Sequence, residues 1–443
     1  MKLQCIARIA LVALLFPFSS AALSAQFSFE VSTIPKQGQF AGEDINVHKD
    51  VVGFVDIIES GSLKRMGFVR RGGEITLIDF PGSEILNGTE ARGINDDGVV
   101  VGRFAENTPN GLTLRGFTLM NGQLEQFDVP NSTYTDTTDI NNRGAILGRT
   151  QPVSSPFVGE AFVRTGDEYR VFVPAEVTEF FGVLPLGFND RGDMVGQVFA
   201  DGQFRAFAIL DGVYSHFTVP DSYYTAAEGI NNANRIVGWY CKPDCSSIHG
   251  FLMDRRGLFN IDVPVQDSYA TYLRGISNNG FLVGSVGFHR FPIQEVVVGT
   301  PCQQVGGDCV AAQRLGDPLI DFMVSAEIDV RPGSSTDPVN PSAHGVLPVA
   351  ILGSEEFSGV EVDQATITFG PNGARPVSGR VVDMDGDGLL DLFLRFRMEE
   401  TGIDAERPDA CMTGALVTGG RFKGCTTVRI VPIGVSSRYS APD

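Results

Sequence analysis

The residues with the clearest chemistry are the aspartates of one short segment near the C-terminus, DMDGDGLLD. Oxygen ligands at positions 1, 3, 5 and 9 of a tight loop, a glycine at position 6 and a main-chain carbonyl at position 7 are typical of a Ca²⁺ loop. The expected ligands are Asp383, Asp385, Asp387, the carbonyl of Leu389, and Asp391. Position 12 is Leu394, so the bidentate Glu of a complete EF-hand is missing. The alternative is an acidic turn without a specific ion.

The N-terminus has the layout of a secretory signal peptide. Lys2 and Arg8 precede an apolar run that ends at Phe18, and small residues follow up to Ala25. The apolar run is roughly 10 residues long, whereas a membrane-spanning helix needs about 20. We therefore predict a leader at residues 1–25, no transmembrane segment, and a protein secreted to the periplasm or the cell exterior.

The cysteines that remain after removal of Cys5 with the leader lie in three close pairs. An even number of cysteines in an exported chain indicates disulfides, and neighbours in sequence are the easiest to join. Zinc binding by the first pair is less well supported, because a Cys-x-x-x-Cys site needs a second pair of ligands. The predicted disulfides are Cys241 with Cys245, Cys302 with Cys309, and Cys411 with Cys425.

Net charge argues against one class of partner. The chain carries a formal charge of −19 at pH 7, and loss of Lys2 and Arg8 with the leader would make it −21. Such a charge repels phosphate backbones and favours solubility and divalent cations. Nucleic acid is therefore not an expected partner, and we expect a monomer.

A repeated phrase organises most of the sequence. Each copy has an anchor residue, usually Ile-Asn, then a polar turn and a Val-Gly pair. The anchors lie at 45, 94, 140, 188, 230 and 276, which are 49, 46, 48, 42 and 46 residues apart. This period matches one four-stranded blade of a β-propeller, so the anchors predict about six blades.

Each unit also contains a Gly-Phe or Ala-Phe strand and a short strand that ends in proline, while turns such as Asn-Asp-Asp-Gly supply the positive φ of tight hairpins. The first unit is incomplete, and the orphan pair Gly287-Phe288 follows the last anchor. We therefore predict that the last strand completes the first blade and closes the ring.

The Gly-Phe, Asp-x-Pro and Gly-Ile-Asn-x-x-Gly-x-x-Val-Gly phrases resemble the HAF-type extracellular repeat of secreted bacterial proteins. The resemblance covers about residues 27–295 and implies a β-propeller and an extracellular location. It implies no chemistry for particular residues. On this basis residues 26–298 are the predicted propeller, and a cysteine-bracketed linker is predicted at 299–325.

Residues 326–435 predict a small Ig-like β-sandwich, followed by a tail at 436–443. Short strand-like runs separated by turn residues cover 346–352, 365–369, 390–396 and 427–431. The calcium loop resembles those of integrin-type and thrombospondin-type sites. The module as a whole resembles a C-terminal accessory or adhesion domain of secreted bacterial proteins, through Ile328-Asp-Val-Arg-Pro-Gly, Gly345-Val-Leu-Pro-Val, Ala365-Thr-Ile-Thr-Phe-Gly and Glu400-Thr-Gly.

The search for catalytic motifs is negative. The sequence has no Gly-x-Ser-x-Gly elbow, no His-Glu-x-x-His and no Walker loop, and its five histidines (48, 216, 249, 289 and 344) are isolated in sequence. The single Trp239 offers little surface for stacking on sugars. We predict a non-enzymatic binding or surface-interaction protein with Ca²⁺ as its cofactor and an unknown protein or glycan ligand at the propeller loops.

Two alternatives stay open. A glycoside hydrolase or lyase acting on extracellular polysaccharide could carry its carboxylates on different blades and so leave no local motif. A purely structural envelope or matrix component would need no concave polar pocket. Convergent Asp and Glu side chains at the mouth of the channel would favour the hydrolase.

Overall fold

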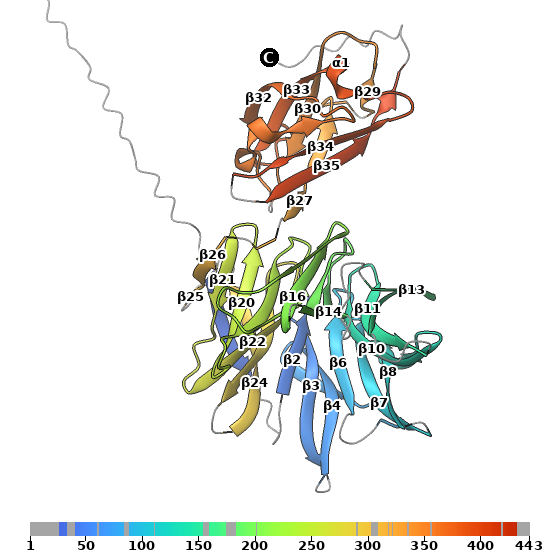
Figure 1. Cartoon of the computed structure of the whole chain (residues 1–443), viewed down its shortest axis with the longest axis vertical. Coiled ribbons are helices and arrows are strands. Elements are labelled where there is room, and N and C mark those ends of the chain that lie inside the picture. Colours follow the sequence, from blue (N-terminus) through green and yellow to red (C-terminus); the bar gives the residue numbers. More distant parts are fainter. Residues whose placement is uncertain are drawn as a thin grey trace, which may run out of the picture.

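The computed structural model describes residues 26–32, 40–59, 62–83, 88–109, 111–153, 159–173, 183–200, 202–288, 291–302, 309–317, 319–320, 322–334, 336–354, 357–417 and 420–431. These ranges consist almost entirely of β-strands, so the all-β class is confirmed (Figure 1). The predicted leader at 1–25 and tail at 436–443 lie outside the described residues. Across the described ranges, no helix combines the length and the apolar character needed to cross a membrane.

Four sheets of the N-terminal part each contain four antiparallel strands in sequence order. The first is β2 (Phe40–Ile45), β3 (Val51–Glu59), β4 (Ser62–Arg71) and β5 (Glu74–Ile78). The second is β6 (Thr89–Ile94), β7 (Val100–Thr108), β8 (Gly111–Met120) and β9 (Gln123–Phe127). The third is β10 (Ser132–Ile140), β11 (Ile146–Pro152), β12 (Glu160–Thr165) and β13 (Glu168–Phe172). The fourth is β14 (Val183–Phe188), β15 (Met194–Ala200), β16 (Gln203–Leu210) and β17 (Val213–Phe217).

A ten-stranded sheet contains the remaining strands of this part. They are β18 (Tyr224–Ile230), β19 (Ile236–Cys241), β20 (Ile248–Asp254), β21 (Gly257–Ile261), β22 (Ser268–Ile276), β23 (Leu282–Phe288), β24 (Phe291–Pro301), β1 (Gln26–Ser32), β25 (Val310–Ala311) and β26 (Gln313–Gly316). Only one residue pair, Ile248 with Ala270, joins β20 to β22. Division at that bridge gives two groups of five strands, one for each of the last two anchors: β18–β21 with β26, and β22–β24 with β1 and β25. The propeller architecture is confirmed, and the count of six blades stays a prediction.

Ring closure differs from the prediction. The N-terminal strand β1 pairs antiparallel with β24 and so completes the last unit, whereas the prediction had the last strand completing the first. The orphan Gly287-Phe288 is the end of β23, which pairs with β22 and β24 inside the same unit. Either arrangement closes the ring for the same physical reason. A strand from one end of the chain pairs with the sheet at the other end, and no sheet edge is left open.

The anchor asparagines join each unit to the next. Each side-chain amide donates to the main-chain carbonyl of the following anchor, from Asn46 to Asn95 (3.1 Å), Asn95 to Asn141 (3.4 Å), Asn141 to Asn189 (3.0 Å), Asn189 to Asn231 (3.2 Å) and Asn231 to Ser277 (3.0 Å). The amide of Asn279 donates to the carbonyl of Val47 (3.1 Å) and links the last unit to the first. The anchors are therefore inter-unit connectors as well as turn residues.

The Val-Gly and Gly-Phe phrases fit together across one strand pair. Gly102 lies opposite Phe117, and a Cβ on Gly102 would be 2.0 Å from the carbonyl oxygen of Glu90 and 2.8 Å from the Phe117 ring. The glycine of each Val-Gly pair makes the same close approach to its inner strand. Fully buried phenylalanines fill the space above the glycines in five units: Phe68, Phe117, Phe162, Phe207 and Phe251.

The C-terminal module is a sandwich of two four-stranded sheets. One contains β27 (Met323–Ser325), β35 (Arg421–Thr427), β34 (Asp409–Ala415) and β31 (Thr368–Phe369). The other contains β28 (Glu327–Val330), β30 (Val346–Leu352), β33 (Asp391–Arg397) and β32 (Pro376–Val382). Smaller elements are β29 (Pro338–Val339), β36 (Arg429–Ile430), the 3₁₀ turns Gly359–Glu361 and Gln364–Thr366, and α1 (Met398–Thr401). Buried side chains from both sheets form one core.

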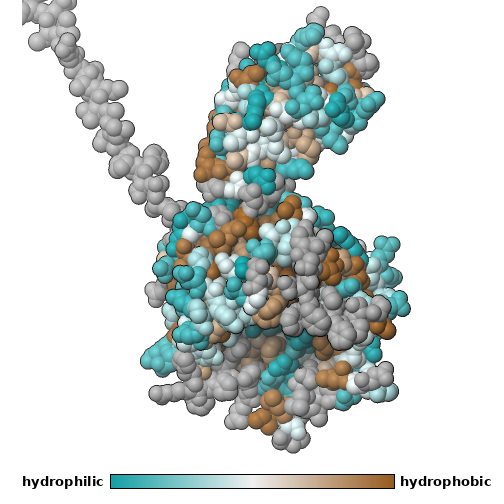
Figure 2. Space-filling model, viewed as in Figure 1, coloured by the Kyte–Doolittle hydropathy of each residue, from teal (hydrophilic) through white to brown (hydrophobic). Residues whose placement is uncertain are grey.

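The segment predicted as a linker at 299–325 contributes strands to both modules. β25 pairs with β1, β26 pairs with β21, and β27 pairs with β35 of the sandwich. Ile320 and Phe322 pack into the propeller core beside Leu258. Figure 2 shows hydrophobic surface on the propeller close to this junction. The two modules are therefore joined by a packed segment rather than a free connection.

All six expected cysteines are paired as predicted. The bonds are Cys241–Cys245 between β19 and β20, Cys302–Cys309 between β24 and β25, and Cys411–Cys425 across β34 and β35. Three disulfides indicate a protein that matures in an oxidising compartment.

We predict that Asn141→Ala destabilises the propeller by about 1–3 kcal/mol, the cost of leaving buried partners unsatisfied. Asn141 Oδ1 accepts the main-chain N–H groups of Arg143 (3.1 Å) and Ala145 (3.0 Å), in addition to the inter-unit bond. Urea unfolding followed by circular dichroism would measure the change. The control is Arg143→Ala, an exposed neighbour in the same turn, which should change stability by less than about 0.5 kcal/mol. Equal effects of the two substitutions would contradict the inter-unit role.

Candidate functional site

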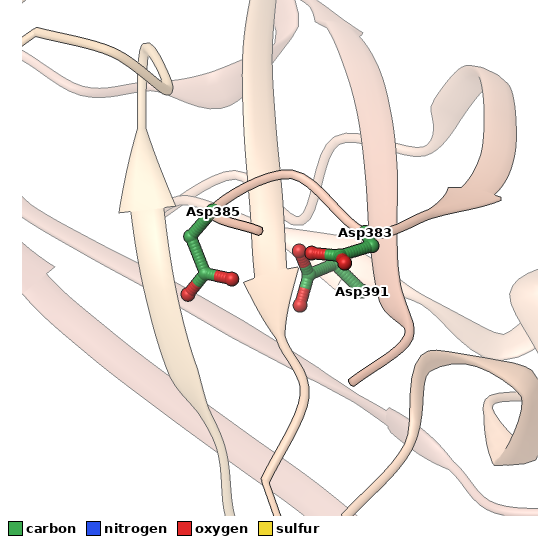
Figure 3. Close-up of side chains that lie close together, drawn as sticks. All are labelled: Asp383, Asp385 and Asp391. Carbon is green, nitrogen blue, oxygen red and sulfur yellow. The ribbon is translucent and has the colours of Figure 1, made fainter. Parts of the chain in front are cut away.

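The predicted calcium loop joins β32 to β33, and it brings three of its carboxylates together (Figure 3). Ligand oxygens of Asp383, Asp385 and Asp391 all lie within 4.8 Å of one another. Asp391 is 1% exposed, whereas Asp383 and Asp385 are exposed. Asp387 is not part of this group, so the loop brings together three of the four predicted carboxylates.

Main-chain N–H groups hold the loop in shape. Asp383 accepts from Gly386 (2.7 Å) and Gly388 (3.1 Å), and Asp391 accepts from Met384 (2.6 Å) and from Gly353 (2.7 Å) at the end of β30. Each carboxylate oxygen has a further lone pair, so these bonds leave acceptor capacity for a cation. Three carboxylates at this separation repel one another, and a hard oxygen-binding cation is the group that would offset the repulsion.

A second candidate site lies on the propeller axis, where every inner strand has a β-bulge. The bulges fall two residues before the anchors, at the residues we call the bulge ring: Glu43, Arg92, Thr138, Leu186, Glu228 and Arg274. Bulges redirect side chains and are frequent beside active sites. The guanidinium of Arg92 lies 3.2 Å from Glu43, and Arg274 lies 3.7 Å from the same carboxylate. The side chains from the first, second and last units thus meet at the axis.

Most acids around the ring are held by arginines. Glu90, which is 2% exposed, forms ion pairs with Arg65 (2.7 Å), Arg92 (2.8 Å) and Arg103 (3.0 Å). Burial alone would raise the pKa of Glu90, but Arg92, Arg103 and Arg65 together hold that pKa well below its usual range. This carboxylate is therefore charged and fully engaged.

Glu228 differs from the other acids of the ring. Burial raises the pKa of Glu228 above its ordinary value, and Glu43 adds to the rise, although Arg274 opposes it. Its Oε1 accepts from Trp239 Nε1 (2.7 Å) and from Gln197 Nε2 (3.4 Å). Within the described part of the chain, no hydrogen bond reaches its other oxygen, Oε2. Glu228 therefore retains acceptor capacity beside the axis.

A row of aromatic side chains adjoins Glu228. Phe199 and Phe204 are 5.2 Å apart, Phe204 and Tyr224 are 5.2 Å apart, and Tyr224 stacks on Trp239 at 4.8 Å. Trp239 then meets Tyr272 edge-on at 5.4 Å. This aromatic row crosses three neighbouring units, and its members are half-buried except Phe204, which is 38% exposed. We call the side of the propeller farthest from the anchor turns the distal face. The aromatic row starts at the strand ends on this face.

The anchor side of the axis carries another acidic pair. A polar cavity of about 50 Å³ there is lined by Asp44, Asp139 and anchor-turn residues. Asp44 accepts the N–H groups of Ile45 (2.8 Å) and Ile94 (2.9 Å), and Asp139 accepts those of Ile140 and Phe188 (2.7 Å each). The other four units have glycine at this position: Gly93, Gly187, Gly229 and Gly275. Each of the two aspartates thus accepts a hydrogen bond from the next unit. The four glycines have no side chain at this position and leave room for the two carboxylates.

One histidine is not isolated in space, contrary to the expectation from sequence. His249 Nε2 lies 2.9 Å from Ser247 Oγ, and its Nδ1 lies 3.0 Å from Asp262 Oδ2. These contacts have the connectivity of a Ser-His-Asp triad. Asp262 is 44% exposed, however, so water competes for the carboxylate, and Ser247 belongs to the β19–β20 hairpin rather than to a strand-to-helix elbow.

The sequence analysis missed the bulge ring and the aromatic row. A signal for the ring was present, because the residue two before each anchor varies among Glu, Arg, Thr and Leu while the surrounding phrase repeats. No local signal marked the aromatic row, since its members come from five strands of three units. Only the packing of neighbouring units brings them together.

Comparisons with known proteins leave function open. No family model matches the chain, and no curated protein is similar to it. Among solved structures, a triple arginine-to-alanine mutant of AofleA from Arthrobotrys oligospora is 11% identical, with a TM-score of 0.35, over 66% of this chain and 94% of that one. YCF48 bound to D1 peptide is 9% identical, with a TM-score of 0.33, over 63% and 97%. A glycosyl hydrolase from Bacteroides ovatus is 9% identical, with a TM-score of 0.29, over 66% and 87%.

At these values the similarities have no weight for function, and the assignment to the propeller class depends on the strand pairing described above. The HAF-type resemblance stays a prediction from the sequence.

We predict a pH-dependent contribution from the axial aspartates. Burial raises the pKa of Asp44 from 3.8 to about 7, and it raises the pKa of Asp139 well above its ordinary value, with Asp44 adding to the rise. A carboxyl that binds its proton more tightly in the folded state stabilises folding below its unfolded pKa, and this contribution is lost as the pH rises through the folded pKa.

The measurement compares the free energy of unfolding of the natural protein with that of an Asp44→Asn, Asp139→Asn variant. The natural protein should lose at least about 1 kcal/mol relative to the variant between pH 5 and pH 8, which corresponds to roughly one pKa unit. The control is Asp97→Asn, an exposed aspartate of an anchor turn. Parallel pH curves for the natural protein and the double variant would refute the prediction.

Proposed function

We propose that this protein is a secreted, non-enzymatic binding protein whose ligand site lies on the distal face of the propeller, beside the bulge ring. One observation carries this proposal: the inner-strand bulges bring charged side chains of four units together at the axis, and a half-buried aromatic row adjoins them. Aromatic surface with a few convergent polar groups is the usual composition of a ligand site. The rest of each repeat is used for packing and for joining units.

Pairing of the charged side chains supports a binding role over catalysis. Glu43 and Glu90 form ion pairs with arginines. Asp262 is exposed, so its contact with His249 would stabilise a protonated imidazole only weakly. A general acid or base needs a pKa tuned to its task and an available proton path. Export is supported by the three disulfides and by the predicted leader, and the HAF-type resemblance agrees with an extracellular propeller.

A glycoside hydrolase is the second candidate, and one observation favours it. The pKa of Glu228 is raised while that of Glu90 is lowered, and a division of this kind separates the acid from the base in carboxylate enzymes. Beside the bulge ring, however, Glu90 is occupied by three guanidinium groups. It has no free oxygen to activate water unless an arginine moves away.

The binding proposal predicts saturable association without turnover. The full chain would be tested against purified extracellular polysaccharides and matrix proteins, with release of reducing ends and of peptides measured in the same samples. Association should weaken in Glu228→Gln and persist in Glu74→Gln, an exposed acid on β5. A fluorophosphonate probe should leave Ser247 unlabelled.

Product release would favour the hydrolase, and labelling of Ser247 would favour an acyl-transfer enzyme. Failure to bind any of these materials would favour a structural envelope or matrix component. Each of these outcomes is incompatible with the proposed function.

We propose further that the loop at 383–391 binds Ca²⁺ as a structural ion. Asp383, Asp385 and Asp391 would supply carboxylate oxygens, and Asp387 and the Leu389 carbonyl would complete the shell after a local adjustment of the loop. Because Asp391 also accepts from Gly353, the ion would fasten the loop to the end of β30. Its effect would be on the stability of the sandwich, through binding to the folded state alone.

Calcium should bind saturably in calorimetry and raise the thermal unfolding temperature of the sandwich. EDTA should lower that temperature, since removal of a ligand that binds only the folded state removes its stabilisation. Asp385→Ala should abolish the binding heat and the thermal shift. Glu406→Ala, which removes an exposed acid of the same module outside the loop, should retain both. Absence of saturable heat in the natural protein would leave the loop as an acidic turn.

A further inference from the structure

The aromatic row adjoins Glu228, a carboxylate of the bulge ring whose Oε2 accepts no hydrogen bond from the described residues. From the rim inward, the row passes from Phe204 through Tyr224 and Trp239 to Tyr272. Arg274 lies over the Tyr272 ring at 5.5 Å and ends the row at the axis. The distal face thus presents apolar ring surface on one side and charged hydrogen-bonding groups on the other.

The polar groups of the aromatic row donate hydrogen bonds to other side chains of the protein. Trp239 Nε1 donates to Glu228, and the hydroxyl of Tyr224 donates to Gln197 Oε1. Gln197 in turn donates to Glu228. The donors of the aromatic side chains are therefore used within the protein, and Glu228 Oε2 accepts no hydrogen bond from the described residues.

This pattern discriminates between ligand classes. A proline-rich peptide docks on aromatic-lined grooves and presents carbonyl acceptors. Trp239 and Tyr224 have no uncommitted donor for such carbonyls. A sugar presents hydroxyl groups that can donate to a carboxylate, and its ring has a C–H face that suits the negative face of an aromatic ring. Donation to Glu228 and packing on the row are both available to a sugar.

The charge of the protein narrows the class of sugar that the site could bind. The chain has a net charge of −19, and Arg92 and Arg274 are already paired with Glu43. Glu228 would repel an acidic sugar when ionised.

We propose that the aromatic row and Glu228 bind a neutral carbohydrate. A pyranose ring packs on Phe204 and the outer part of the row, and one of its hydroxyl groups donates to Glu228 Oε2. This inference rests on the proposed binding function and names the ligand class of the same site. It also gives a role to Trp239, the single tryptophan of the sequence.

Trp239 is the only tryptophan of the chain, so its fluorescence reports this site alone. Neutral glucan, mannan and galactan oligosaccharides would be titrated into the full-length protein, with alginate oligosaccharide as the acidic comparison. A neutral sugar should shift Trp239 emission saturably, and alginate should not. Phe204→Ala should weaken binding about tenfold or more, and Glu228→Gln should do the same.

Phe204 is exposed, so Phe204→Ala should fold, and thermal unfolding would verify this for every variant. Val171→Ala removes a similarly exposed apolar side chain from the outer strand β13 and should bind as the natural protein does. Sugar binding that leaves Trp239 emission and both variants unaffected would overturn the inference by placing the glycan elsewhere. Association with proteins but not with any neutral glycan would overturn it too, while the proposed binding function would stand.

Discussion

The hydrogen bonds between anchor asparagines are the constraint on which the rest of the propeller depends. Each Asn uses its side-chain oxygen to close its own turn and its amide to bind the next unit, so the local turn and the global ring are specified by one residue. Because these bonds join neighbouring inner strands, the bulges two residues before the anchors lie at equivalent positions, and four of them bring charged side chains together. The candidate ligand site follows from this register.

The repeat separates packing from recognition. Glycine and phenylalanine positions are nearly invariant among the units because a Cβ at the glycine would strike the inner strand, and the facing ring fills the space that is left. The bulge position has no such restriction, since it faces the axis and not a neighbouring strand. A propeller of this kind can therefore change its axial side chains without loss of the fold.

The sandwich places its acidic loop far along the sequence from the propeller site, yet the two modules are physically connected. Arg255 of the β20–β21 turn forms an ion pair with Glu361 (2.6 Å), and Phe322 lies in the propeller core while its carbonyl accepts from Arg421 of β35. These contacts lie at the anchor end of the strands. The sandwich thus leaves the distal face uncovered, consistent with a ligand site there (Figure 1).

The all-β class, the propeller architecture, the three disulfides and the acidic loop could be predicted from the sequence, because each depends on residues close together in the chain or on a fixed period. The prediction placed the closing strand in the wrong unit, since pairing between distant strands has no local signal. The bulge ring, the Ser247–His249–Asp262 contacts and the aromatic row could not be predicted in this way, because they form only when distant strands pack together. Phe199, Phe204, Tyr224, Trp239 and Tyr272 span 74 residues of chain and meet because neighbouring units pack side by side around one axis.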